Sequence, residues 1–144
     1  MSDIAAEPSI PGVARRQSGW RQLVLALGCT AAYGVFLVLP YYVNNLDAFP
    51  LEDVAAGYHD PKDLWPLDTT FGGIVFGAAG LMTVLLGPAV TLGALSWALV
   101  GLWRDRAADW RFRGMSLVAV VVALGTLVWL VSPFGAALMK WQLD

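Results

Sequence analysis

The chain has 144 residues, of which 58% are hydrophobic and 14% are charged, and its formal net charge is −2. Its mean hydropathy is +0.62, whereas soluble domains contain about 45–50% apolar and about 25% charged residues. The composition therefore excludes an ordinary soluble domain and favours a membrane protein. The single cysteine, Cys29, excludes an internal disulfide and is interpreted as a packing residue of the first apolar segment.

The first 19 residues are polar, lack apolar periodicity and are interrupted by Pro8, Pro11 and Gly12. Such a segment has too few large apolar side chains to bury against a core of its own. We therefore expect residues 1–19 to be a flexible cytoplasmic tail that precedes a membrane domain over residues 20–144.

Three long segments carry no Asp, Glu, Lys, Arg or His, and each exceeds the roughly 20 residues that a helix needs to cross the hydrocarbon core. They run from Gln22 to Leu46, from Thr69 to Trp103 and from Gly114 to Met139. These segments predict an all-α integral membrane protein with three transmembrane helices, over about 22–43, 71–103 and 115–139. An outer loop, 44–70, and an inner loop, 104–114, join the helices.

Basic residues near the ends of the spans predict the orientation. Seven arginines lie before span one or between spans two and three, whereas only Lys62 and Lys140 lie on the opposite side. We therefore expect the N-terminus to be cytoplasmic and the C-terminus to be outside. The excess of arginine over lysine is typical of GC-rich bacterial genomes, so the expected location is the bacterial cytoplasmic (inner) membrane, with several passes.

Span two would be about 50 Å long as a straight helix, against a hydrocarbon core of about 30 Å. It must therefore tilt, protrude or bend, and Gly87-Pro88 is a candidate kink. Alternating steps of four and three residues predict one face of this helix that is almost entirely small. The predicted helix-packing interface consists of Gly73, Gly77, Gly80, Gly87, Thr91, Ala94, Ala98 and Gly101, with Val84 as the larger member of the same face.

Small residues let helices approach closely in lipid, where the hydrophobic drive for association is weak. Two occupants of this face remain open. Spans one and three of the same chain could cover it, with Gly28, Ala32 and Gly125 turned towards it. Alternatively, a helix of another subunit could cover it.

Proton relays, ion pathways and haem ligation in a membrane need ionisable or ligating side chains within the spans. The three spans contain none, and nucleophile motifs, phosphate loops and paired cysteines are absent from the sequence. We therefore expect no catalytic residue, no cofactor and no metal site. A transporter could instead use the backbone at broken helices, for which Gly87-Pro88 and Ser132-Pro133 are the candidates.

Both loops carry candidate contact residues. The outer loop is acidic but rich in large apolar side chains, which suggests a surface for a partner. Its predicted partner contacts are Tyr58, His59, Leu64 and Trp65, and an alternative interpretation gives His59 with Asp60 and Asp63 a divalent cation. The inner loop is basic and aromatic, with predicted contacts to lipid headgroups or a partner through Arg104, Arg106, Trp110, Arg111 and Arg113.

These observations favour a non-catalytic accessory or structural subunit of a larger bacterial membrane complex, of the respiratory or transport type, that contributes helix packing and an ordered outer loop. Its expected partners are other integral membrane subunits and membrane lipids, with no nucleic acid. One alternative is a small homo-oligomeric transporter or channel. Another is a metal-binding or enzymatic protein that works at the outer loop.

Overall fold

The structure of the chain, a computed structural model, describes residues 19–104 and 109–143. All elements within these ranges are helical, and none of the described residues forms a strand. Three helices are long and apolar enough to cross a membrane: Gly19–Val43, Thr70–Arg104 and Trp110–Leu130. For the described residues, the prediction of an all-helical chain with three helices long and apolar enough to cross a membrane is therefore confirmed. The expected tail lies outside the described residues, apart from Gly19, which begins the first helix.

The first span consists of α1 (Gly19–Tyr33), a π-helical turn η1 (Gly34–Val38) and α2 (Leu39–Val43). Pro40 is the second residue of α2, which directly continues η1. The helical path passes through the proline and ends at Val43, the predicted boundary.

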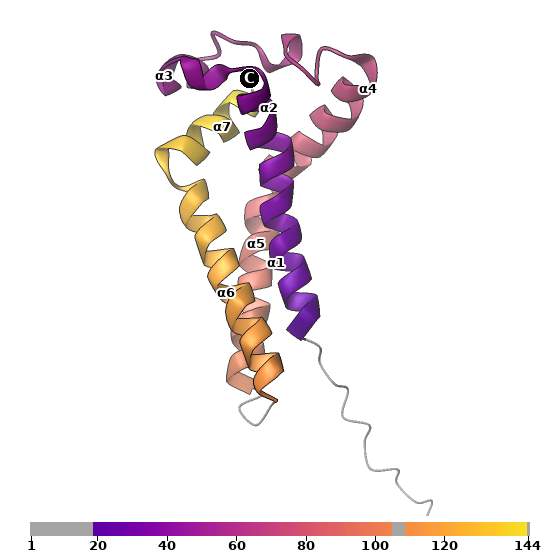
Figure 1. Cartoon of the computed structure of the whole chain (residues 1–144), viewed down its shortest axis with the longest axis vertical. Helices are drawn as coiled ribbons and strands as arrows, with labels where there is room; N and C mark the ends of the chain where they lie inside the picture. The colour runs from indigo at the N-terminus through magenta and orange to yellow at the C-terminus, as the bar shows by residue number, and fades with distance from the viewer. Residues whose placement is uncertain (1–18, 105–108, 144) are drawn as a thin grey trace, which may run out of the picture.

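The second span consists of α4 (Thr70–Gly72), a π-helical turn η4 (Gly73–Gly77) and α5 (Ala78–Arg104). The Oγ1 atom of Thr69 accepts a hydrogen bond of 2.9 Å from the backbone N–H of Gly72 and so caps the start. Pro88 lies inside α5, which continues through it. The α4 end of this span leans away from α2 and α7 (Figure 1).

The third span, α6 (Trp110–Leu130), ends at Leu130, whereas the sequence predicted a helix over 115–139. A separate helix, α7 (Pro133–Leu143), follows after a turn. The hydroxyl of Ser132 donates to the carbonyl of Trp129 at 2.6 Å and accepts from the N–H of Gly135 at 3.1 Å. Ser132-Pro133 is therefore the start of a new helix, with serine as its N-cap and proline in its first turn.

Helix α7 folds back towards the top of α2 (Figure 1), where it meets the long connection between spans one and two. This connection contains η2 (Leu46–Ala48), α3 (Leu51–Ala55) and η3 (Pro61–Asp63). We refer to residues 44–69 together with α7 as the cap. The expected outer loop is thus a layer of short helices that covers one end of the bundle.

Two clusters of buried side chains form the core. One consists of small residues from the three spans: Ala26, Ala98, Ala119, Val120 and Ala123. The other consists of larger residues from the spans and the cap: Tyr33, Leu37, Tyr41, Leu46, Val54, Val84, Leu130, Leu138 and Trp141. The spans lie close together in the lower half of Figure 1 and diverge towards the cap, because alanines permit a closer approach than tyrosine or tryptophan.

Candidate functional site

The small-residue face of α5 lies against other parts of the same chain. Its buried members are Gly80, Val84, Thr91, Ala94, Ala98 and Gly101, and Gly73, Gly77 and Gly87 are partly buried. The face predicted from the steps of four and three residues is thus the face that α5 turns inwards.

Long side chains lie opposite three glycines of this face, whereas small residues pack against Ala98. A Cβ atom built on Gly80 would meet Nε2 of Gln142 at 2.8 Å, and one built on Gly101 would meet Nε2 of Gln22 at 2.7 Å. A Cβ atom on Gly87 would collide with the hydroxyl group and ring of Tyr33. Each of these glycines therefore makes room for a side chain from the first span or from α7.

The Gly73–Gly77 pair has the spacing typical of helix dimers, but Leu67 of the cap lies over it. A Cβ atom on Gly73 would meet the carbonyl oxygen of Leu67 at 2.9 Å, and a Cβ atom on Gly77 would meet the Cδ2 atom of Leu67 at 3.5 Å. Conversely, Gly28 and Gly125, which one of the two alternatives turned towards span two, have no atom within 4 Å of a built Cβ. A Cβ atom at either glycine would therefore meet open space rather than the face of α5.

Gln22 joins all three spans through hydrogen bonds of its buried side chain. It is 2% exposed, and its Nε2 donates to the carbonyl of Trp97 on α5 at 3.3 Å. The hydroxyl of Ser116 on α6 donates to its Oε1 at 2.6 Å. From the sequence alone, Gln22 is only the predicted boundary of span one. The feature that could have indicated its role is a polar amide directly after Arg21 and before a long apolar run.

An open groove of about 390 Å³ lies between the first and third spans. It is lined by Thr30, Tyr33, Gly34, Val38, Val122, Gly125, Thr126 and Trp129. The hydroxyls of Thr30 and Thr126 lie 2.7 Å apart across it, and each is within bonding distance of a carbonyl four residues earlier. This pair is a second polar link between α1 and α6, and the rest of the lining is chiefly apolar.

Hydrogen bonds from two side chains hold the parts of the cap together and tie it to the first span. The indole Nε1 of Trp141 on α7 donates to the carbonyl of His59 at 2.7 Å. The side-chain amide of Asn44 donates to the carbonyls of Pro40 and Trp65, each at 2.7 Å, and accepts from the N–H of Trp65 at 3.2 Å. The connection is thus tied both to α7 and to the end of the first span.

The four predicted contact residues of the outer loop divide into two groups. Tyr58 and Trp65 point outwards, with 77% and 45% of their surface exposed, and Phe49 nearby is also 45% exposed. Leu64 packs against the core cluster of large residues, and His59 is half-buried. The ring of His59 lies 4.3 Å from that of Phe49, measured between centroids. Only Tyr58 and Trp65 of the predicted four therefore present a free aromatic surface.

Among the described residues, the side chains around His59 do not form the cation site that the alternative interpretation requires. Within residues 19–104 and 109–143, no three side chains of His, Cys, Asp or Glu lie together in a group that could hold a metal ion. The carboxylate of Asp60 instead accepts a hydrogen bond of 2.9 Å from the backbone N–H of Lys62, which caps η3. His59 contributes a carbonyl acceptor and a ring contact to the cap.

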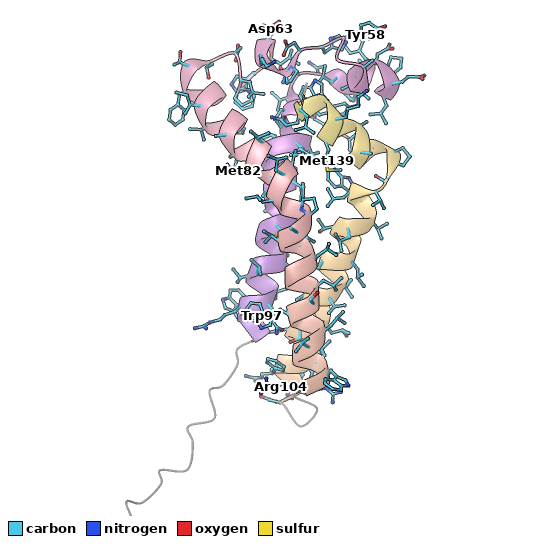
Figure 2. The ribbon with its side chains drawn as sticks, turned by 180° about the vertical axis from the view of Figure 1, so that it is seen from behind. Tyr58, Asp63, Met82, Trp97, Arg104 and Met139 are labelled. Atoms are coloured by element: carbon cyan, nitrogen blue, oxygen red, sulfur yellow. The ribbon has the colours of Figure 1, made fainter. Side chains whose placement is uncertain are left out.

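The opposite end of the molecule carries the described arginines, namely Arg21, Arg104, Arg111 and Arg113, all of them exposed. We call it the arginine end; Figure 2 shows Arg104 there, far from Tyr58 and Asp63 in the cap. Trp103 and Trp110 are 72% and 75% exposed, and the guanidinium of Arg111 lies 5.8 Å from the centroid of the Trp110 ring. Arg106, also a predicted contact, lies outside the described residues. Exposed arginine beside exposed tryptophan is typical of the boundary between lipid and water.

Three long apolar helices with aromatic and charged residues at their ends are typical of a multi-pass membrane protein. The scan against protein-family models, the search of curated proteins and the search of solved structures each returned no match to this chain. A functional proposal therefore rests on the surfaces of the chain itself.

Proposed function

We propose that this chain is a non-catalytic accessory subunit of a larger bacterial membrane complex, of the respiratory or transport type, and that it contacts a partner subunit through its cap. The observation that supports the proposal most is the exposure of Tyr58, Trp65 and Phe49 on a segment that is tied to α7 and to the end of the first span. A fixed backbone that presents aromatic side chains has little entropy to lose on binding, which favours protein contacts.

The cap is the better partner surface because the small-residue face of α5 is already filled. Tyr33, Gln22, Gln142 and Leu67 occupy the places where a second helix would otherwise approach its glycines. A partner helix would have to expel these side chains from the groove. Of the two occupants left open for the face of span two, the proposal takes the same chain, so that α5 holds the subunit together and the partner contacts the cap.

Mild detergent extraction of the tagged full chain from its own membrane, followed by native mass measurement, tests this role. We expect a stable complex that contains at least one other membrane protein. A mass that corresponds only to copies of this chain would contradict the proposal and favour a homo-oligomeric transporter or channel.

A pair of variants tests the place of contact. Tyr58→Ser should reduce the recovery of the partner, because an interface aromatic commonly contributes about 2 kcal/mol or more to binding. Trp103→Ala is the matched control, since Trp103 has a similar exposed fraction but lies at the arginine end. Equal losses from both variants would contradict contact through the cap.

A further inference from the structure

A groove at the arginine end combines apolar walls with a single cation. It has a volume of about 350 Å³ and is lined by Trp20, Arg21, Val24 and Leu25 of α1 and by Trp97 of α5. Trp20 with Val24 and Arg21 with Leu25 are neighbours one helical turn apart, so the four residues cover one side of α1. All five lining residues are exposed, so the groove opens on the outside of the bundle.

Buried contacts fix the width of this groove. Gln22 and Ala26 turn inwards from the same two turns of α1, and Gln22 donates its hydrogen bond to the carbonyl of Trp97 itself. Trp97, whose side chain forms the far wall, is therefore also held to α1 by a hydrogen bond to its backbone carbonyl. Figure 2 shows Trp97 at the level of the first turns of α1. The groove is part of the packing between two spans rather than an accident of surface side chains.

The position of Arg21 matches that of a phospholipid headgroup. It lies in the first turn of α1, immediately before an uncharged run that extends to Leu46. No carboxylate among the described residues pairs with it. A guanidinium forms two parallel hydrogen bonds to a phosphate, and tryptophans favour the same depth in a bilayer. Arg104, Arg111 and Arg113 at the same end add positive potential, which favours a lipid of net negative charge.

We propose that this groove is a binding site for an anionic glycerophospholipid of the bilayer. The guanidinium of Arg21 binds the phosphate, and one acyl chain lies along Val24, Leu25 and Trp97. The site is separate from the partner contact proposed for the cap, because it lies at the other end of the bundle. If the lipid did not bind at this groove, the proposed accessory role would not be affected.

Native mass measurement of the purified full chain, titrated with phosphatidylglycerol or with phosphatidylcholine of the same acyl chains, tests the site. We expect the anionic lipid to be retained about fivefold more than the zwitterionic one, the ratio given by about 1 kcal/mol for one arginine near the surface. An excess of inorganic phosphate should not displace it. Equal retention of the two lipids, or displacement by phosphate, would overturn the proposal.

Variants separate this groove from a general attraction to the arginine end. Arg21→Gln should reduce retention of phosphatidylglycerol to the level of phosphatidylcholine, whereas Arg21→Lys should keep part of the preference. Leu25→Trp should reduce retention while Arg21 is intact, because the larger ring fills the groove. Arg113→Gln is the matched control outside the groove, and an equal loss from it would contradict a localised site. Circular dichroism checks that each variant keeps its helices.

Discussion

The side chain of Tyr33 on α1 occupies the space that any side chain at Gly87 of α5 would need. This relationship indicates that the glycines and alanines on one face of the second span pack against other segments of the same chain. In lipid, where helices gain little by hiding apolar surface, such close contacts supply the energy of packing. The glycines on the inner face of α5 therefore make room for bulky residues of the same chain.

Gly87→Ala should destabilise the protein by about 1–3 kcal/mol, because the new methyl group collides with the hydroxyl and ring of Tyr33. Unfolding followed by circular dichroism in a mild detergent measures the change. Gly93→Ala is the matched control on the same helix, since a Cβ there meets nothing within 4 Å. The double variant Tyr33→Leu, Gly87→Ala should recover part of the loss. Equal stabilities of the two single variants would contradict this contact.

Gln22→Met should lower the free energy of unfolding by about 1–2 kcal/mol, because it keeps the length of the side chain but removes the links to Trp97 and Ser116. A double-mutant cycle with Ser116→Ala measures how much of this loss comes from the 2.6 Å hydrogen bond. Thr83→Val is the control, since Thr83 bonds only to Ala79 of its own helix. Strict additivity in the cycle would show that Gln22 and Ser116 act independently.

Trp141→Phe should loosen the cap, because it removes the indole donor to the His59 carbonyl and keeps an aromatic ring in the core. A hydrogen bond contributes about 1 kcal/mol, so local opening around residues 56–62 should increase roughly fivefold. Hydrogen–deuterium exchange measures it. Trp103→Phe, at the arginine end, should leave exchange in the cap unchanged. Protection that is unaffected by Trp141→Phe would mean that other contacts hold the cap.

The predicted orientation can be tested by cysteine labelling in intact bacterial cells. In a Cys29→Ser background, Asp63→Cys in the cap should react with a membrane-impermeant maleimide. Arg113→Cys at the arginine end should react only after the cells are permeabilised. This result follows from the tendency of arginine-rich ends to stay in the cytoplasm. If only residue 113 were labelled in intact cells, the orientation would be the opposite of the predicted one.

The sequence predicts the spans well because an apolar run of more than about 20 residues without a charge is typical of a helix that crosses a bilayer. It also predicts the inner face of α5, since a face of small residues is visible in the spacing of one helix. It does not predict what fills that face. Tyr33, Gln22, Gln142 and Leu67 come from three distant segments, and only the folded chain brings them together.

The end of the third span shows where hydropathy fails. No charged residue lies between Arg113 and Lys140, so the hydropathy of the sequence does not reveal that the helix ends at Leu130. Ser132-Pro133 combines an N-cap with a first-turn proline, a pattern that starts a helix as readily as it kinks one. The two π-helical turns at Gly34–Val38 and Gly73–Gly77 have no comparable signal in the sequence.

Photo-crosslinking from the cap tests the proposed role most directly. A photoreactive phenylalanine analogue placed at residue 58 of the full chain, in its own membrane, should form an adduct with another membrane protein on irradiation. The same analogue at residue 103 serves as the control and should yield no such adduct. Adducts at residue 58 only with other copies of this chain, or protein adducts only from residue 103, would contradict an accessory subunit that binds through its cap.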